Sequence, residues 1–363
     1  MHLAPHRSIL LLTRGLDPVG VGRQVELAAS GLRARGWDVK LAVTTGGGSV
    51  PERLARAGFP VHRLGRRPGV GPDVAVGLAR LAKADASALI LSFGRSQALL
   101  AGAVRRVLPG PRVVCQLALP PRGVLAAWAL RQADRVVAAS PAVAQACLEM
   151  GVSTERVCVV PPGVSPAAGT GLSREQLAER LGLRAQSIWT LCVAPLEPAS
   201  HLDRLIWAID QLGVVHQGLE HLLVGAGPLL GKVRRRARVQ QLAARLHVFP
   251  TLDCLPDLLP RVRLVWQPGN VACGGALLDG MAHGIGTVAV ESDAARQLIL
   301  PGVTGTIVPA DPESEFPRRA FNLIEDNALA ARYGSAARAR VAELFSPEQY
   351  VAGVEAAVLE ALQ

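Results

Sequence analysis

Several residue classes are scarce in this chain, and each scarcity limits what the protein can be. Aromatic residues make up only 4% of its 363 residues, so the core must be built from Leu, Val, Ala and Ile. Such a core is typical of sheets that helices cover on both faces. No run of about 20 apolar residues occurs, and we expect no membrane-spanning helix. The apolar run near the start, residues 9–12, is too short for a secretory signal, which favours a cytoplasmic protein.

Clusters of metal-binding residues are also missing. The six cysteines are scattered, and no CxxC motif or Cys/His cluster groups them. We therefore expect reduced thiols in the core of a cytoplasmic protein. Because the sequence has no Asp-x-Asp motif either, it offers no ready set of metal ligands. We expect neither a metal ion nor a resident cofactor.

Positive charge is abundant, with a formal net charge of +10 that comes almost entirely from arginine. The densest basic run is "GKVRRRARVQQLAARLH", residues 231–247. Two interpretations remain open: a solvated helix face, or a contact with acidic lipid head groups or an anionic substrate. A nucleic-acid partner is disfavoured, because we find no binding module and no aromatic residues placed for base stacking.

Strand-like apolar runs alternate with helical patterns along the chain. The first half has such runs at residues 8–13, 38–45, 88–93, 112–119, 135–140 and 156–163. Residues 164–171, rich in Pro, Gly and small residues, indicate a linker, after which the alternation restarts. The pattern predicts an α/β protein with two doubly wound Rossmann-like domains facing across a cleft. We expect these domains at residues 1–165 and 172–345, with a final helix in residues 346–363.

Three glycine-rich segments stand between a predicted strand and a predicted helix. In "GLDPVGVG", Gly20 and Gly22 fit part of a dinucleotide fingerprint, but Val25 occupies the third glycine position and no acid ends the next strand, where Thr44 and Thr45 stand. A nicotinamide dehydrogenase is therefore disfavoured. The loop is either a plain surface turn or a close approach of the backbone to a ligand.

The other two segments lie in the second half of the chain. "LLVGAGPLLG" holds Gly225 and Gly227 and can pack against a base or a phosphate. In "GNVACGGALLDGMAHG", Gly274 and Gly275 precede a helix whose free N–H groups would attract a diphosphate. Asp279, about one turn further on, is either a ribose-binding carboxylate or a solvated acid on a helix.

With these motifs, the chain resembles the GT-B glycosyltransferases of family 4 (glycosyl transferases group 1), retaining enzymes that use nucleotide sugars. Residues 133–164 resemble the family's segment that runs into the interdomain linker. "LLVGAGP", "LLDGMAHGIGTVAVES" and "ILPGVTGTIVPADP" resemble its glycine loop, its "LLEAMA-G-PVVA" element and its "DGxTGxLVPxxD" turn. The resemblance implies that the final helix crosses back to brace the first domain.

The resemblance also implies roles for individual residues. Asp279 would hold the ribose, in place of the second of two family glutamates spaced eight residues apart. The remaining donor-binding positions are glycines: Gly274 and Gly275 at the diphosphate, Gly225 and Gly227 at the base, and Gly20 and Gly22 over the phosphates from the first domain.

In the second half of the chain, three positions depart from the family pattern. The first glutamate of the pair falls on Val271, so the catalytic residue is unassigned. The Arg and Lys that hold the diphosphate fall on Pro195 and Ser200. Since lost transition-state donors each cost about 2.7–4 kcal/mol, these changes would slow catalysis by orders of magnitude unless other cations replace them. The candidate replacements for phosphate contact are Arg14, Arg23, His201 and Arg204, with Arg95 after the third strand.

Two functions therefore stay open. The first is transfer of a sugar, with retention, from a nucleotide sugar to an unknown acceptor, either a glycan or a lipid-linked molecule. The second is a non-catalytic relative that binds a sugar nucleotide or regulates a partner enzyme. The basic run adds a third hypothesis, peripheral contact with the anionic inner face of a membrane.

Overall fold

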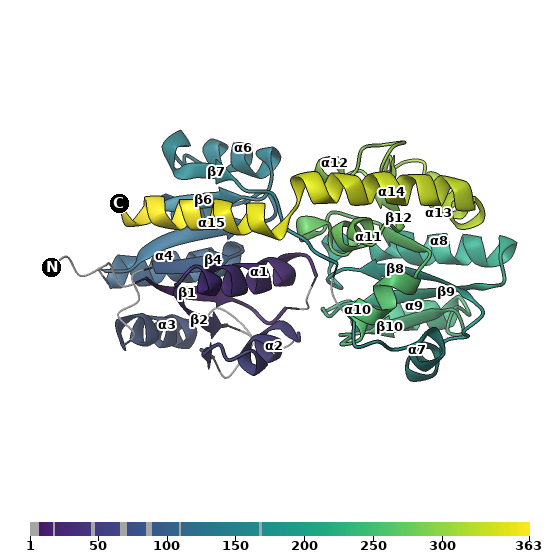
Figure 1. The fold of residues 1–363 in the computed structure, drawn as a ribbon, viewed down its shortest axis with the longest axis horizontal. Coiled ribbons are helices and arrows are strands. Elements are labelled where there is room, and N and C mark those ends of the chain that lie inside the picture. Colours follow the sequence, from purple (N-terminus) through teal and green to yellow (C-terminus); the bar gives the residue numbers. More distant parts are fainter. Residues whose placement is uncertain are drawn as a thin grey trace. The chain divides into compact units, whose positions relative to one another are not determined.

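The computed structural model describes residues 7–16, 19–44, 48–65, 71–84, 89–108, 110–166 and 169–363 (Figure 1). The chain forms two compact units: unit 1 comprises Met1–Gly163 and Pro347–Gln363, and unit 2 comprises Val164–Ser346. The chain therefore passes between the units twice. Parts of the sequence-based predictions lie outside the described residues, namely residues 17–18 of the first glycine loop, Thr45, Ala88 and linker residues 167–168.

Unit 1 contains a seven-stranded parallel sheet in the order β3-β2-β1-β4-β5-β6-β7. Its strands are β1 (Ser8–Thr13), β2 (Asp38–Val43), β3 (Val61–Arg63), β4 (Leu89–Phe93), β5 (Arg112–Leu117), β6 (Arg135–Ala138) and β7 (Val157–Val159). Its helices are α1 (Val21–Ala34), α2 (Val50–Arg56), α3 (Pro72–Ala84), α4 (Arg95–Val107), α5 (Val124–Arg131), α6 (Pro141–Glu149) and α15 (Pro347–Leu362).

Helices cover both faces of this sheet, as β1 illustrates. Ile9 and Leu11 belong to one apolar cluster, and Leu10 and Leu12 to a second one. Successive strand residues point to opposite faces, so the two clusters lie on the two sides of the sheet. The first cluster contains residues of α1, α2 and α15, and the second contains residues of α3 to α6. The C-terminal helix is therefore part of the core of unit 1.

Unit 2 contains a six-stranded parallel sheet in the order β10-β9-β8-β11-β12-β13. Its strands are β8 (Ile188–Val193), β9 (Leu219–Val224), β10 (Leu246–Phe249), β11 (Leu264–Gln267), β12 (Gly286–Val290) and β13 (Thr306–Val308). Its helices are α7 (Arg174–Leu181), α8 (Leu202–Val215), α9 (Leu230–Val239), α10 (Leu255–Leu258), α11 (Leu277–Ala282), α12 (Asp293–Leu298), α13 (Glu315–Glu325) and α14 (Asn327–Leu344). The predicted class, two doubly wound α/β folds, is confirmed.

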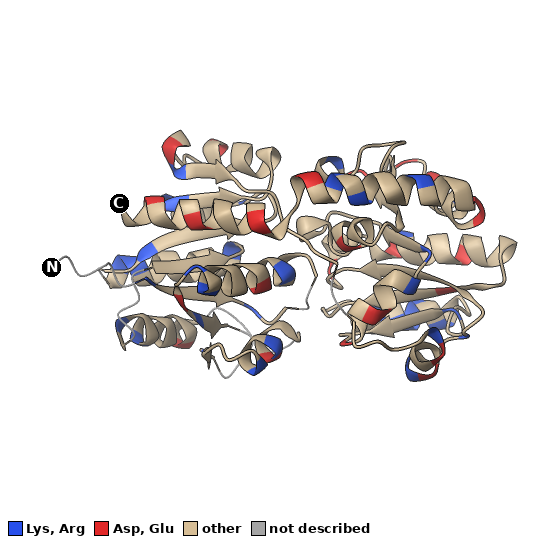
Figure 2. Cartoon of the chain, viewed as in Figure 1, with Lys and Arg blue, Asp and Glu red and all other residues tan. Residues whose placement is uncertain are grey.

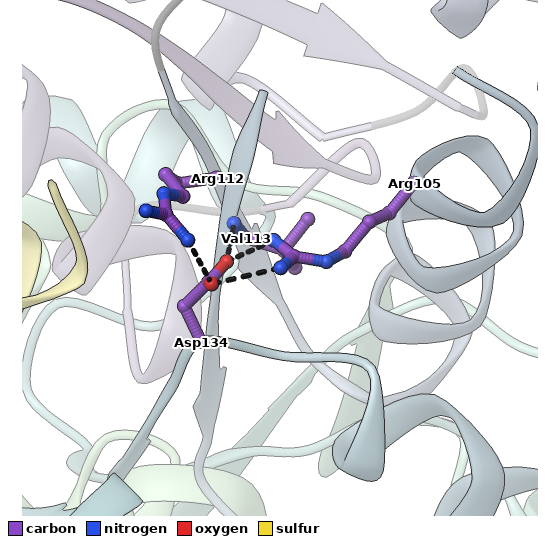
Figure 3. A network of polar contacts seen from close by, with 4 residues as sticks. All are labelled: Arg105, Arg112, Val113 and Asp134. Carbon is purple, nitrogen blue, oxygen red and sulfur yellow. Dashed lines mark hydrogen bonds and ion pairs between the residues drawn. The ribbon is translucent and has the colours of Figure 1, made fainter. Parts of the chain in front are cut away.

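Charged residues lie mostly on the helices and connections, and the strands of both sheets carry few of them (Figure 2). Asp134, just before β6, shows how one such charge joins elements of unit 1 (Figure 3). Its carboxylate pairs with Arg105 of α4, accepts from Arg112 Nη1 at 3.1 Å, and accepts from the Val113 N–H at 2.8 Å. One aspartate thereby ties α4 and β5 to the start of β6.

Candidate functional site

Three loops of unit 2 meet where neighbouring strands end. They follow β8, β9 and β11 and comprise residues 194–201, 225–229 and 268–276; we call this side of the sheet the carboxyl edge. The first two loops are joined by backbone hydrogen bonds, from the Leu196 N–H to the Ala226 carbonyl at 2.9 Å and from the Leu229 N–H to the Leu196 carbonyl at 2.9 Å. In parallel α/β sheets this edge is where ligands bind.

The glycines of the second loop are required by this close contact. Gly225 and Gly227 have φ of +156° and +155°. A Cβ atom at Gly225 would lie 1.9 Å from the Ala194 carbonyl oxygen, and one at Gly227 would lie 2.5 Å from that of Leu196. Backbone therefore meets backbone here. The sequence indicated a ligand-facing role for both glycines and did not reveal that they join two loops.

Gly274 and Gly275 form a tight turn before α11. Their φ angles are +69° and +56°, and a Cβ at Gly275 would lie 2.4 Å from the Val193 carbonyl oxygen. The N–H groups that we expected to face a diphosphate donate instead to the carbonyls of Val271, at 2.8 Å, and Ala272, at 3.2 Å. A short 3₁₀ turn over Ala272–Gly274 causes this difference, because it uses both donors internally.

The backbone donors left at this turn belong to the next residues. Within the described part of the chain, the N–H groups of Ala276, Leu277 and Leu278 donate to no protein acceptor. These are the orphan donors that any helix start leaves, and they carry its partial positive charge. The backbone donors available for a diphosphate thus lie one to three residues beyond Gly275, and not at Gly274 and Gly275 as predicted from the sequence.

Asp279 lies in the first turn of α11, and its relative exposure is only 2%. The alternative of a solvated surface acid is therefore wrong. The charge of this carboxylate also acts on Cys273 in the 3₁₀ turn. Burial, and then the nearby charge of Asp279, raise the pKa of the Cys273 thiol to about 12. The helix itself packs directly on β11, because Gly280 leaves room for the Val265 side chain, which a Cβ would approach to 2.8 Å.

The environment of Val271, where the resemblance places the first family glutamate, is apolar. Val271 is 5% exposed and belongs to the main core cluster of unit 2, together with Trp266 and Leu202. One of its methyl groups would lie 3.3 Å from a Cβ at Gly275. The valine therefore fills the space between the turn and the core.

The two positions where the resemblance places diphosphate-binding cations contact each other. Ser200, which is buried, donates from Oγ to the Pro195 carbonyl at 2.6 Å. A Cβ at Gly269, in the loop after β11, would lie 2.8 Å from the Ser200 carbonyl oxygen. Residues 195–200 thus form a closed turn packed against the next loop.

The candidate replacement cations are spread over both units. Arg204 of α8 donates to the carbonyls of Pro268, at 3.0 Å, and Ala310, at 3.4 Å, so its guanidinium lies at the carboxyl ends of β11 and β13. His201, at the start of α8, is exposed. In unit 1, Arg14 directly follows β1 and is exposed, whereas Arg23 in the first turn of α1 is buried.

The corresponding edge of unit 1 holds a polar network that the sequence did not reveal. Gly20, with φ of +53°, begins α1, and the Gly22 N–H donates to the Val19 carbonyl at 3.1 Å. The Gln24 side chain, one turn later, donates to the Gly163 carbonyl at 2.9 Å and accepts from the Gly163 N–H at 2.8 Å. The Tyr350 hydroxyl contacts both the Gln24 carbonyl, at 3.2 Å, and Gln116 Oε1, at 2.9 Å. No local motif announces contacts between residues so distant in the sequence.

Among the described residues, no group of three or more His, Cys, Asp or Glu side chains is placed to hold a metal ion. Within those same ranges, every helix is too short or too polar to cross a bilayer.

Two doubly wound units with glycine turns at their carboxyl edges match the GT-B fold. Residues 19–163 match the family "Glycosyl transferase 4-like domain", and residues 188–326 match "Glycosyl transferases group 1". The chain belongs to this family 4, group 1 type of glycosyltransferase, as its motifs predicted.

Curated relatives are distant. A GDP-mannose-dependent alpha-(1-6)-phosphatidylinositol monomannoside mannosyltransferase of Mycolicibacterium smegmatis is 27% identical over 231 residues, which cover 57% of each chain. A D-inositol 3-phosphate glycosyltransferase of Acidothermus cellulolyticus is 26% identical over 236 residues, 64% of this chain and 50% of that one. The chain thus matches about half the length of these relatives.

Solved structures share the fold over nearly the whole chain. Anabaena HepE in complex with UDP and glucose has a TM-score of 0.80 and 18% identity, and the match covers 97% of this chain and 99% of that one. WaaG, a glycosyltransferase involved in lipopolysaccharide biosynthesis, has a TM-score of 0.75 and 17% identity at the same coverage.

Proposed function

We propose that this glycosyltransferase binds a nucleotide sugar at the carboxyl edge of unit 2 and transfers the sugar, with retention, to an acceptor alcohol. One observation carries the proposal: a buried carboxylate, Asp279, lies in the first turn of a helix whose first N–H groups donate to no protein acceptor. An acid and free amide donors one turn apart suit a ribose diol and a diphosphate respectively.

Each part of the edge has a role in this proposal. Asp279 accepts hydrogen bonds from the ribose, and the N–H groups of 276–278 take the diphosphate where Gly274 and Gly275 were expected to do so. Gly225 and Gly227 shape the loop beside the base. Arg204 is the cation at this edge that is best placed to add charge, since its guanidinium already lies at the ends of β11 and β13.

The relatives indicate which donors and acceptors to test first. UDP accompanies HepE in its solved complexes, and GDP-mannose is named for the mycobacterial relative. An inositol phosphate and phosphatidylinositol derivatives are named for the curated relatives, so alcohols that carry a phosphate are the first acceptor class. The six free cysteines favour a location on the cytoplasmic side of the membrane, where thiols stay reduced.

Nucleotide binding by Asp279→Asn tests the ribose role. Calorimetric titration with UDP, GDP and ADP first identifies the base. For that nucleotide, loss of a charged hydrogen bond to ribose should weaken binding about tenfold or more. The 2′-deoxy nucleotide, which lacks one ribose hydroxyl, should lose much less on the same substitution. Asp293→Asn, in the first turn of α12, is the matched control and should bind like the parent chain. Equal losses for both nucleotides would contradict the role of Asp279.

A second function, nucleotide binding without transfer, is favoured by one specific observation. Val271 belongs to the core, and Ser200 is hydrogen-bonded to Pro195. The three positions where the resemblance places catalytic or diphosphate-binding charges therefore hold no ionisable group. Donor hydrolysis measured beside binding separates the two functions. Tight nucleotide binding without release of sugar would support the non-catalytic function, and sugar release that Arg204→Gln abolishes would support the enzyme.

A further inference from the structure

One side-chain amide at the carboxyl edge of unit 2 lacks a hydrogen-bond partner. Gln267 is the last residue of β11, and it is only 2% exposed. Among the described residues, neither atom of its amide takes part in a hydrogen bond. Leaving a buried amide unpaired is unfavourable, and native proteins seldom keep such a group without a ligand, an ion or a water molecule that satisfies it.

The amide of Gln267 lies against the tight turn that precedes α11. Successive residues of a strand point to opposite faces of the sheet. Trp266 belongs to the core cluster that holds residues of α8 and α13, whereas Val265 faces α11, where a Cβ at Gly280 would approach it to 2.8 Å. Gln267 shares the face of Val265, and a Cβ at Gly275 would lie 3.0 Å from Gln267 Oε1.

The two atoms of this amide have different surroundings. Nε2 is fully enclosed, whereas Oε1, which also lacks a partner, is not and so borders space that a small polar group can enter. The position that a Cβ of Gly275 would take lies 2.4 Å from the Val193 carbonyl oxygen and 3.3 Å from Val271 Cγ1. Two oxygen acceptors and one methyl group therefore surround a place that Gly275 has no side chain to fill.

This lining determines which chemical group can bind there. Carbonyl and amide oxygens only accept hydrogen bonds. The oxygens of a diphosphate also only accept, so they find no partner at this place, whereas a hydroxyl group donates its hydrogen. Asp279 is the group that we propose for the ribose hydroxyls. The hydroxyls that remain in a nucleotide sugar are those of the transferred sugar.

The residues next to Gln267 support a ligand contact at this loop. Asn270 has a second enclosed amide atom without a partner, its Oδ1. Val271 Cγ1 and Gln267 Oε1 both lie close to the position of the absent Cβ of Gly275. The polar group at this turn therefore comes from residue 267, and not from residue 271, where the resemblance places the first family glutamate.

Buried glutamines with a structural role are paired, as two of them in unit 1 show. Gln24 uses both atoms of its amide to bond the backbone of Gly163. Gln97 of α4 donates from Nε2 to Thr44 Oγ1 at 3.1 Å. Gln267 has no comparable contact, so holding the fold together does not account for its presence in the core of unit 2.

We propose that Gln267 is a specificity-determining residue of the donor site, and that its amide oxygen accepts a hydrogen bond from a hydroxyl of the transferred sugar. This inference rests on the proposed nucleotide-sugar function and adds to it the residue that recognises the sugar. The unpaired amide destabilises the free protein, and it gains its partner only when the donor binds.

Calorimetric titration of the full chain with UDP-glucose, GDP-mannose and ADP-glucose, each beside its free nucleoside diphosphate, tests the proposal. In Gln267→Leu, affinity for the nucleotide sugar should fall about tenfold, because a sugar hydroxyl loses its acceptor. Affinity for the free diphosphate should stay within about twofold of the parent, because that ligand carries no sugar hydroxyl to this place. Gln240→Leu is the matched control, since its Oε1 is also enclosed without a partner but lies at the far end of α9. It should change neither affinity.

Thermal melts separate recognition of the sugar from a structural role. Gln267→Leu should melt at or above the temperature of the parent, because it removes an unpaired buried amide, whereas Gln97→Leu removes a paired one and should melt lower. Equal losses for diphosphate and nucleotide sugar, unchanged affinity for both, or a lower melting temperature in Gln267→Leu would each overturn the inference. If the parent chain binds none of these nucleotides, the proposed function itself fails, and the inference fails with it.

Discussion

The carboxyl edges of the two units are built in different ways. In unit 1 the edge is held by buried polar side chains, among them Gln24, Gln116 and Tyr350, and cations stand exposed around it. In unit 2 the edge is held by backbone, through glycine turns at Gly225, Gly227 and Gly275 that no other residue could replace. A scaffold made of backbone keeps its shape when side chains change. Unit 2 can therefore present these turns with the uncharged residues Val271, Pro195 and Ser200 at the positions where the resemblance places charged ones.

The most severe test of this comparison is Gly225→Ala. The added Cβ would lie 1.9 Å from the Ala194 carbonyl oxygen, and the Ala194 backbone is held in place by the hydrogen bond from its N–H to the Val224 carbonyl at 3.0 Å. We expect unit 2 to lose about 4 kcal/mol or more of its free energy of unfolding, measured by denaturant titration. Gly231→Ala is the control, because a Cβ there meets nothing within 4 Å and helix α9 should gain about 0.5–1 kcal/mol. Similar stabilities for the two variants would refute the backbone argument.

In unit 1 the matching test removes a side chain. Gln24→Leu leaves the N–H and carbonyl of Gly163 without their partner in a buried site. We expect a loss of about 3 kcal/mol in the free energy of unfolding of unit 1. Gln145→Leu, on the exposed side of α6, should change it by less than about 0.5 kcal/mol. A small effect at Gln24 would mean that backbone holds this edge too.

Acid should lower the free energy of unfolding of unit 2, because unit 2 contains a buried histidine. His221 of β9 is fully buried beside Thr190 Oγ1, 2.7 Å from its Nδ1. Burial, and then the positive charges of Arg245, His247 and His216, lower its pKa to about 3. Below about pH 6.5 the unfolded chain binds a proton that the folded unit does not, so stability falls as pH falls from there towards 3.

The expected slope is about 1.4 kcal/mol per pH unit, which amounts to about 2 kcal/mol at pH 5. Melting followed by tryptophan fluorescence, to which Trp189, Trp207 and Trp266 of unit 2 contribute, measures this loss. His221→Gln, which cannot titrate, should remove most of the slope. An unchanged pH profile in that variant would show that other groups cause the acid sensitivity.

The smallest expected effect concerns a side chain at the backbone-built edge. Ser200→Ala removes the bond from Oγ to the Pro195 carbonyl, and we expect a loss of about 1 kcal/mol in the free energy of unfolding of unit 2. Ser200→Thr keeps a hydroxyl and serves as the control. If Ser200→Ala cost as much as Gly225→Ala, side chains would hold unit 2 as they hold unit 1.

The sequence predicted those features that depend on local pattern. Apolar runs located the described strands of both sheets except β3, which is only three residues long, and the glycines of residues 225–227 and 274–275 located the two turns of unit 2. What each glycine contacts could not be predicted, because the Ala194 carbonyl beside Gly225 comes from another loop. The use of the Gly274 and Gly275 N–H groups in a 3₁₀ turn depends on φ angles that glycine permits but does not impose. The Gln24–Gly163 pair joins residues 139 positions apart, which no single sequence reveals.

The route of the chain through unit 1 has a practical consequence. Helix α15 supplies Tyr350, Val354 and Val358 to the core of unit 1, yet it reaches them only after the chain has built all of unit 2. Proteolytic cleavage just after Gly163, where the chain first leaves unit 1, would therefore yield two fragments that stay associated. The C-terminal fragment would still supply helix α15 to the core of the N-terminal fragment. Expressed alone, residues 1–163 would present an uncovered apolar groove to solvent, and a synthetic peptide of residues 347–363 would complement it.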